Sequence, residues 1–358
     1  MAVDSSPVLP GRLGTPGMAM KDDPRADPRM IAAMAPFDLG ELPVPLPIDA
    51  QSPFDSLLEL VAATEEGMEM MMAAFAADAP SVDDVTRSVE VIPGVDGNDI
   101  TLFIHRPDGV EGPLPGILHI HGGGMVLLEA AGAGYSNWRD ELAGAGLVVV
   151  GVEFRNGGGK HGPYPFPAGL NDCSSALAWV NDNKRALGIS KVVVSGESGG
   201  GNLTLATTLK AKRDGRIDQI DGVYAQCPYI SNAYSQKAPE LPSLYENDGY
   251  FLSCESMGLL SRVYDPNLDN ATNPLAWPYY ATSADLGGLP PHVISVNQLD
   301  PLRDEGLAYY RKLLDAGVSA SSRTVNGTAH AADIMFQAAM PEVHATTIRD
   351  IAGFAASL

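Results

Sequence analysis

From residue 85 onward, short apolar runs rich in β-branched residues alternate with longer stretches of helical composition. Continuous apolar strands that alternate with helices indicate a mostly parallel sheet covered on both faces. The sequence therefore predicts an α/β fold for this part of the chain. The expected strands are 85–92, 100–105, 116–120, 147–154, 191–195, 222–227, 292–296 and 322–325. The expected helices are 137–143, 167–187, 199–212, 304–316 and 341–356.

The N-terminal 84 residues differ from this pattern and predict an arm followed by cap helices. Residues 1–26 are rich in Pro, Gly and Asp, which favours an arm that is either mobile or draped over the protein. Helices are expected at 28–35 and 54–77, and the density of apolar residues in the second predicts burial on more than one side. This helix either packs in the core or forms a flexible lid, because the methionines around 68–75 adapt their shape.

The alternation is interrupted at residues 232–285, which contain several Pro and aromatic residues. We expect an inserted helical part of the cap here, within a catalytic domain spanning 85–358. Tyr250, Phe251 and Trp277 are the candidates to close the side of a substrate pocket opposite the methionine-rich helix.

Charge and cysteine content narrow the partners and the compartment. The 358 residues include 23 basic and 44 acidic side chains, a formal net charge of −21, which disfavours nucleic acid and anionic membrane surfaces as partners. Three widely spaced cysteines fit neither a disulfide framework nor a zinc pattern. Without a secretory signal or a membrane-length apolar run, we expect a cytoplasmic protein with buried free thiols.

Residues 196–202 read Gly-Glu-Ser-Gly-Gly-Gly-Asn and contain the pattern G-x-S-x-G. The pattern alone is weak, but an apolar strand precedes it and a helical run follows it. This strand–turn–helix context is that of a nucleophile elbow, where glycines allow a sharp turn around an exposed serine. We therefore predict Ser198 as the nucleophile.

Residues 121–124, His-Gly-Gly-Gly, directly follow the strand predicted at 116–120. Glycines let backbone N–H groups approach a ligand oxygen closely. We predict an oxyanion hole made by the N–H groups of Gly122, Gly123 and Gly199, the residue after the nucleophile. His121 is interpreted as a residue that holds this loop.

A carboxylate and a histidine follow two later strands. Asp300 comes after the strand 292–296, at the edge where open α/β sheets bind ligands. His330 lies in a small-residue loop after the strand 322–325, whereas His292 opens a strand and His344 lies in the last helix. The order Ser, Asp, His is that of α/β-hydrolases, so His330 is the predicted general base and Asp300 its orienting carboxylate.

Other motifs do not indicate a cofactor or a metal. Residues 157–160, Gly-Gly-Gly-Lys, lack the spacing of a phosphate-binding loop and are expected to form a flexible surface loop. Metal-ligand clusters and a dinucleotide-binding glycine pattern are also lacking in the sequence. We therefore expect no cofactor and a small-molecule ester as the substrate.

Taken together, these motifs resemble the hormone-sensitive-lipase-like family of bacterial esterases. The matching segments, in the family's order, are 121–124, 164–173, 196–202, 300–306 and 327–330. The resemblance implies an α/β-hydrolase core, an N-terminal helical cap, hydrolysis of carboxylic esters with short to medium acyl chains, and frequent dimers, so a homodimer is one state to expect. The chain departs from the family's usual elbow, Gly-Asp-Ser-Ala-Gly-Gly-Asn, at Glu197 and Gly199.

Two rival functions share these features. An amidase or peptidase uses the same triad, although no large N-terminal propeller is present in the sequence. A non-catalytic ligand receptor can also use the fold, but such proteins lose a triad member and every member has a candidate here. The sequence therefore predicts a serine carboxylesterase acting through Ser198, Asp300 and His330.

Overall fold

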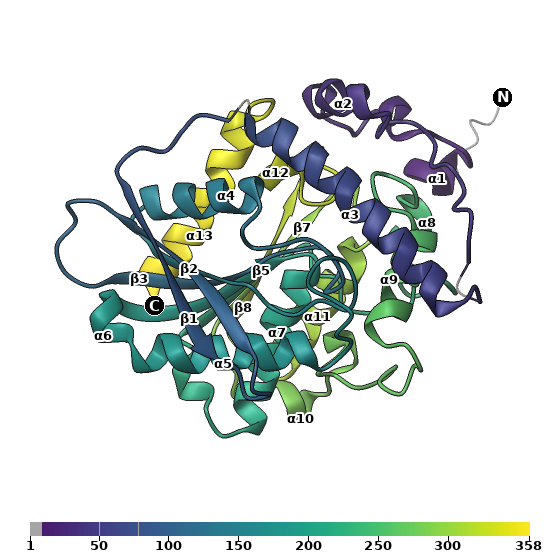
Figure 1. Cartoon of the computed structure of the whole chain (residues 1–358). Helices are drawn as coiled ribbons and strands as arrows, with labels where there is room; N and C mark the ends of the chain where they lie inside the picture. The colour runs from purple at the N-terminus through teal and green to yellow at the C-terminus, as the bar shows by residue number, and fades with distance from the viewer. Residues whose placement is uncertain (1–8, 50, 78) are drawn as a thin grey trace.

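The computed structural model describes residues 9–49, 51–77 and 79–358 and contains one sheet of eight strands in the order β1-β2-β4-β3-β5-β6-β7-β8 (Figure 1). The strands are β1 (Val85–Pro93), β2 (Asp99–Pro107), β3 (Leu114–Ile120), β4 (Val148–Val152), β5 (Ile189–Glu197), β6 (Gly222–Gln226), β7 (His292–Asn297) and β8 (Ala320–Val325). β2 runs antiparallel to β1 and to β4. The remaining pairs, from β4 through β3, β5, β6 and β7 to β8, are all parallel. Every strand predicted from the sequence is present.

The helices also follow the predicted pattern. They are α1 (Gly11–Gly14), α2 (Pro28–Met34), α3 (Phe54–Ala77), α4 (Ala133–Gly144), α5 (Ala168–Asp182), α6 (Lys184–Leu187), α7 (Gly199–Arg213), α8 (Ser243–Glu246), α9 (Cys254–Tyr264), α10 (Ser283–Leu286), α11 (Arg303–Asp315), α12 (Ala332–Met335) and α13 (Pro341–Ser357). The single helix expected at 167–187 is divided into α5 and α6 at Asn183, whose side chain donates to the carbonyl of Trp179. Helix α4 begins earlier than expected.

Alternate residues of the central strands pack on opposite faces of the sheet. Ile117 and Val193 belong to an apolar cluster with residues of α4 and α13. Their neighbours Leu118 and Val194 belong to a larger cluster with residues of α5, α7 and α11. Because both faces are buried, the strands are apolar throughout rather than alternating with polar residues. The fold prediction is confirmed: this is an α/β-hydrolase architecture with helices on both faces.

Helix α3, the predicted cap helix, packs against α4 and against α9, one of the helices between β6 and β7 (Figure 1). The prediction that α3 is buried on more than one side was wrong. Its buried residues, Leu57, Val61, Glu65 and Met71, repeat at helical spacing and form one face, whereas Met70 is 64% exposed. The helix therefore covers the protein with one face, and Leu58, Leu60, Met68 and Met72 are partly buried and pack against the core.

A buried carboxylate anchors the middle of α3. Glu65 Oε1 accepts the N–H of Leu128 at 2.6 Å, and Oε2 accepts the N–H of Lys160 at 2.8 Å. The loop 157–160 is therefore not the flexible surface loop expected from the sequence. Gly157 and Gly158 are buried and donate to the carbonyls of Met125 and Val126, because this loop lies under the helix.

The segment predicted as a cap insertion, 232–285, contains α8, α9 and α10 between β6 and β7. The part of the N-terminal arm that the structure describes is draped, since Met20 is buried in an apolar cluster with Met30 and Met34. Residues 1–8 lie outside the described part.

All three cysteines, Cys173, Cys227 and Cys254, are buried free thiols, as expected. Within the described ranges, no helix is both long and apolar enough to cross a membrane.

The anchor of α3 yields a stability prediction. Glu65→Ala removes the acceptor of two N–H groups beneath the cap and should lower the free energy of unfolding by about 1–3 kcal/mol. Denaturant unfolding measures this, with Glu66→Ala as the matched control, because Glu66 is exposed on the same helix. Equal stability losses in the two variants would show that the Glu65 contacts do not hold the cap.

Candidate active site

Ser198 lies at the sharp turn between β5 and α7. Its backbone dihedrals, φ 57° and ψ −119°, are strained for a residue with a side chain. Neighbouring backbone hydrogen bonds hold it there: Ser198 N donates to Gln226 O at 3.0 Å, and Tyr229 N donates to Ser198 O at 3.1 Å. This strained turn between a strand and a helix has the geometry expected of the predicted nucleophile elbow.

The glycines after the serine allow direct contact between two backbone segments. A Cβ on Gly200 would lie 1.9 Å from the carbonyl oxygen of Ile120 at the end of β3. A Cβ on Gly199 would lie 2.5 Å from the amide nitrogens of both Gly124 and Met125. The elbow therefore packs closely against residues 121–124, which we call the glycine loop. A methyl group would not fit at Gly199, where the family usually has Ala.

Asp300 and His330 meet as a buried pair. Nδ1–H of His330 donates to Asp300 Oδ2 at 2.7 Å, and Leu302 N donates to Asp300 Oδ1 at 2.9 Å. Because a carboxylate only accepts hydrogen bonds, the Nδ1 proton is fixed and Nε2 remains the basic nitrogen. His330 and Ser198 both line the same cavity, whereas Asp300 lies behind the histidine, fully buried.

The surroundings of His330 tune its basicity. Burial lowers the pKa of His330, but the adjacent Asp300 carboxylate raises it, and the net pKa is well above the ordinary histidine value. Cys227 also lies beside His330, and its side chain stays a neutral thiol because burial raises the pKa of that thiol. Sequence inspection did not single out Cys227, since nothing in its local pattern reveals contact with the histidine.

Cys227, Asp300 and His330 bring potential metal-ligand atoms within 4.8 Å of one another. A metal ion bound to all three would compete with the short His330–Asp300 hydrogen bond. We therefore interpret this cluster as a hydrogen-bonded Asp300–His330 pair with a neighbouring thiol, and not as a metal site.

One of the three N–H groups predicted to form the oxyanion hole, that of Gly122, differs from the prediction. Gly122 N donates to the buried Glu197 Oε1 at 2.8 Å, so this N–H is already engaged and does not point freely into the site. Glu197 also contacts His119 Nε2 at 3.1 Å. Glu197, at which this elbow departs from the usual family pattern, thus holds the glycine loop through its backbone. The motif alone did not reveal this role.

His121 holds the glycine loop, as the sequence analysis expected. Its Nδ1–H donates to the carbonyl of Gly122 at 2.8 Å, and its ring stacks on Phe154 with centroids 4.2 Å apart. The side chain is completely buried and is not part of the cavity lining.

A cavity of about 480 Å³ opens over Ser198 and His330, a size typical of small-molecule sites. Its walls are mostly apolar and include Met68, Met71, Met72, Phe75, Leu127 and Leu260. Phe251 lines it as predicted, but Tyr250 and Trp277 are buried elsewhere and are not among the described residues of its wall. Tyr135, which sequence inspection missed, lines it beside the glycine loop.

Comparison with known proteins places the chain in a family. The sequence pattern of the α/β-hydrolase fold family matches residues 117–334, more than half of the chain. An arylesterase of Saccharolobus solfataricus is 32% identical over 223 residues, which are 60% of this chain and 67% of that protein. The carboxylesterase NlhH of Mycobacterium tuberculosis is 33% identical over 236 residues, which are 63% of this chain and 69% of that protein.

Solved structures extend the similarity to almost the whole chain. Brefeldin A esterase, described as a bacterial homologue of human hormone-sensitive lipase, is 47% identical with a TM-score of 0.93, covering 98% of this chain and 99% of that one. The esterase Est22 is 37% identical with a TM-score of 0.84, covering 94% and 99%. The chain therefore belongs to the α/β-hydrolase fold family, among the bacterial esterases related to hormone-sensitive lipase, and it is a carboxylic-ester hydrolase.

Proposed function

We propose that the protein hydrolyses esters through an acyl-enzyme on Ser198, with His330 as general base and acid and Asp300 as its orienting carboxylate. The observation that carries this proposal is the buried hydrogen bond from His330 to Asp300 beside a cavity that Ser198 also lines. A histidine held in one tautomer beside a strained serine in the same cavity is the arrangement that activates a hydroxyl.

In the acylation step, Ser198 Oγ attacks the ester carbonyl carbon while His330 Nε2 takes the hydroxyl proton. The carbonyl oxygen becomes an oxyanion. We assign its donors to the N–H groups of Gly123, Gly124 and Gly199, replacing Gly122, because the Gly122 N–H is bound to Glu197. The C–O bond to the alcohol then breaks, and protonated His330 gives its proton to the leaving alkoxide.

In the deacylation step, a water molecule attacks the acyl-enzyme carbonyl and His330 takes its proton. The second tetrahedral intermediate collapses, the Ser198 Oγ–acyl bond breaks, and the proton returns to Oγ. The carboxylic acid leaves, and the enzyme is restored with no group consumed except water.

We expect substrates with acyl groups of short to medium length, as the family resemblance implies. Thioether side chains of α3 line the cavity, and methionine adapts to ligands of different shape. Met71 and Met72 line the cavity, which supports the lid interpretation of this helix. We propose that these two residues set the acyl-chain preference.

Replacing the nucleophile tests the proposed chemistry. Ser198→Ala should lower kcat for a p-nitrophenyl ester on the order of 10⁶-fold, because the attacking oxygen is lost. Circular dichroism should show an unchanged fold. Ser175→Ala is the matched control, because its hydroxyl bonds only within α5, and it should keep full activity. More than a small fraction of residual activity in Ser198→Ala would place the nucleophile elsewhere.

The pH profile tests the role of His330. Activity requires the neutral ring, so kcat/KM should rise with pH, and the raised pKa of His330 places the midpoint above about 6.5. Asp300→Asn removes the carboxylate that raises this pKa, so the midpoint should move to lower pH while kcat falls about 10⁴-fold. A midpoint that does not move in Asp300→Asn would contradict the assignment of the pair.

Acyl-chain preference tests the lid. Met71→Ala and Met72→Ala enlarge the cavity and should shift the optimum of a p-nitrophenyl ester series toward longer chains, whereas Phe at either position should shift it toward shorter ones. Met70→Ala on the same helix is the control, because Met70 is exposed and should leave the optimum unchanged. An unchanged optimum combined with a lower melting temperature would show that these methionines only support packing.

A further inference from the structure

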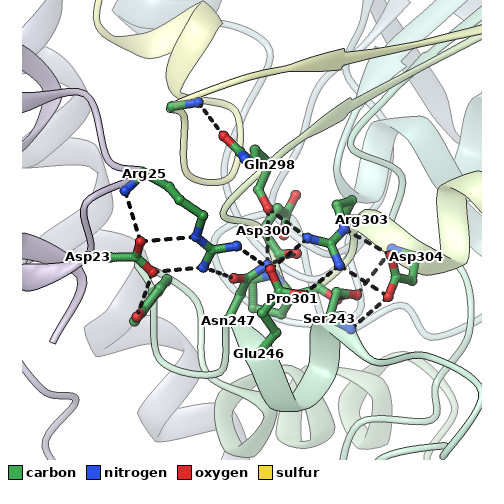
Figure 2. Close-up of polar contacts among 12 residues, drawn as sticks. Asp23, Arg25, Ser243, Glu246, Asn247, Gln298, Asp300, Pro301, Arg303 and Asp304 are labelled. Carbon is green, nitrogen blue, oxygen red and sulfur yellow. Dashed lines mark hydrogen bonds and ion pairs between the residues drawn. The ribbon is translucent and has the colours of Figure 1, made fainter. Parts of the chain in front are cut away.

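Arg25, in the N-terminal arm, is bound on three sides (Figure 2). Its guanidinium pairs with Asp23 through Nε–Oδ1 at 3.0 Å and Nη2–Oδ2 at 2.7 Å. Nη1 donates to Glu246 Oε1, and Nη2 donates to Asn247 Oδ1 at 3.2 Å. The arginine therefore joins the arm to the end of α8, more than two hundred residues later in the chain.

Glu246, the last residue of α8, and Asn247, which follows it, also contact residues 298–303. We call this segment the acid loop, because it carries Asp300. Asn247 Nδ2 lies 3.1 Å from the carbonyl oxygens of both Gln298 and Asp300 and donates to them. Glu246 accepts two bonds from Arg303, each 2.9 Å long. Figure 2 shows one continuous set of contacts from Asp23 through Arg25 to the backbone of Asp300.

The arm also binds the base loop, residues 326–331, which carries His330. Asp27 N donates to Gly327 O at 2.9 Å, and Ala329 N contacts Met30 Sδ at 3.2 Å. Gly327 N in turn donates to Gln298 Oε1 in the acid loop at 2.9 Å. Residues 23–30 therefore contact the base loop directly and reach the acid loop through Glu246 and Asn247.

Apolar contacts already attach the arm without Arg25. Met20, Met30 and Met34 pack in one buried cluster that also contains Leu299 of the acid loop and Ala329 of the base loop. The Arg25 contacts have a different character, because these partly buried ion pairs and hydrogen bonds are directional and hold a specific geometry.

We propose that Arg25 is a positioning residue for the reaction: through Glu246 and Asn247 it fixes the acid loop relative to the base loop, so that Asp300 meets His330 at hydrogen-bond distance. This rests on the proposed roles of Asp300 and His330. A pair 2.7 Å apart loses its bond with a displacement of about 1 Å, which is enough to lower turnover about 10²-fold.

The test compares Arg25 with Arg29, a nearby arginine in α2. Arg25→Ala should lower kcat for a p-nitrophenyl ester about tenfold to 10²-fold with KM within about twofold, because the cavity is not altered. The midpoint of kcat/KM should move to lower pH, since a weaker contact with Asp300 lowers the pKa of His330. Arg25→Lys, which keeps the charge without the forked contacts, should give a smaller loss.

Arg29→Ala is the matched control. Arg29 lies four residues later, in α2, and is also ion-paired, with Asp27 and Glu342, but its side chain is 46% exposed and contacts neither loop. It should keep kcat and the pH midpoint of the unmodified enzyme. All variants are compared after circular dichroism and thermal unfolding have shown that they are folded at the assay temperature.

A second variant keeps the test decisive if Arg25→Ala does not fold. Asn247→Ala removes the donor to the acid-loop carbonyls and should lower kcat and the pH midpoint in the same way. The proposal is overturned if the folded Arg25 variants, or Asn247→Ala in their place, keep kcat within about twofold, or if Arg29→Ala loses as much. Inactive Ser198→Ala beside fully active Arg25→Ala would reject only the positioning role, whereas active Ser198→Ala would reject the proposed function itself.

Discussion

Direct backbone contact between the elbow at Ser198 and the glycine loop after β3 is the constraint on which the site depends. Gly199 and Gly200 lack side chains where a Cβ would collide with the neighbouring main chain. The nucleophile and the proposed oxyanion donors therefore form one unit fixed by the parallel pairing of β3 and β5. Substrate chemistry can vary around this unit, but the distance between attacking oxygen and oxyanion donors cannot vary much.

The proposed acid–base pair depends on a different kind of support. Asp300 and His330 lie on loops after β7 and β8, so the central elbow does not fix them directly. Contacts from the N-terminal arm and α8 hold these loops, while the buried Glu65 holds the cap helix. The proposed reacting centre is thus braced by directional polar contacts, whereas the cavity wall includes adaptable methionines of α3.

Most of the fold was predictable because both faces of the sheet are buried, which makes each central strand a short apolar run. The meeting of Ser198, Asp300 and His330 at one edge of the sheet was predictable for a related reason: each follows a predicted strand, and parallel strands bring their carboxyl ends to one edge. The sequence did not predict the engagement of the Gly122 N–H by Glu197 or the role of Arg25. Both depend on contacts between distant segments, and no local spacing encodes which buried donor meets which acceptor.

Labelling with an organophosphate tests the central claim, that His330 activates Ser198, most directly. A fluorophosphonate should add one phosphonyl group per chain, and peptide mass spectrometry should locate it on Ser198. The same reagent should react far more slowly with His330→Ala, because the serine then lacks its base. A label on another residue, or equally fast labelling of His330→Ala, would contradict the account.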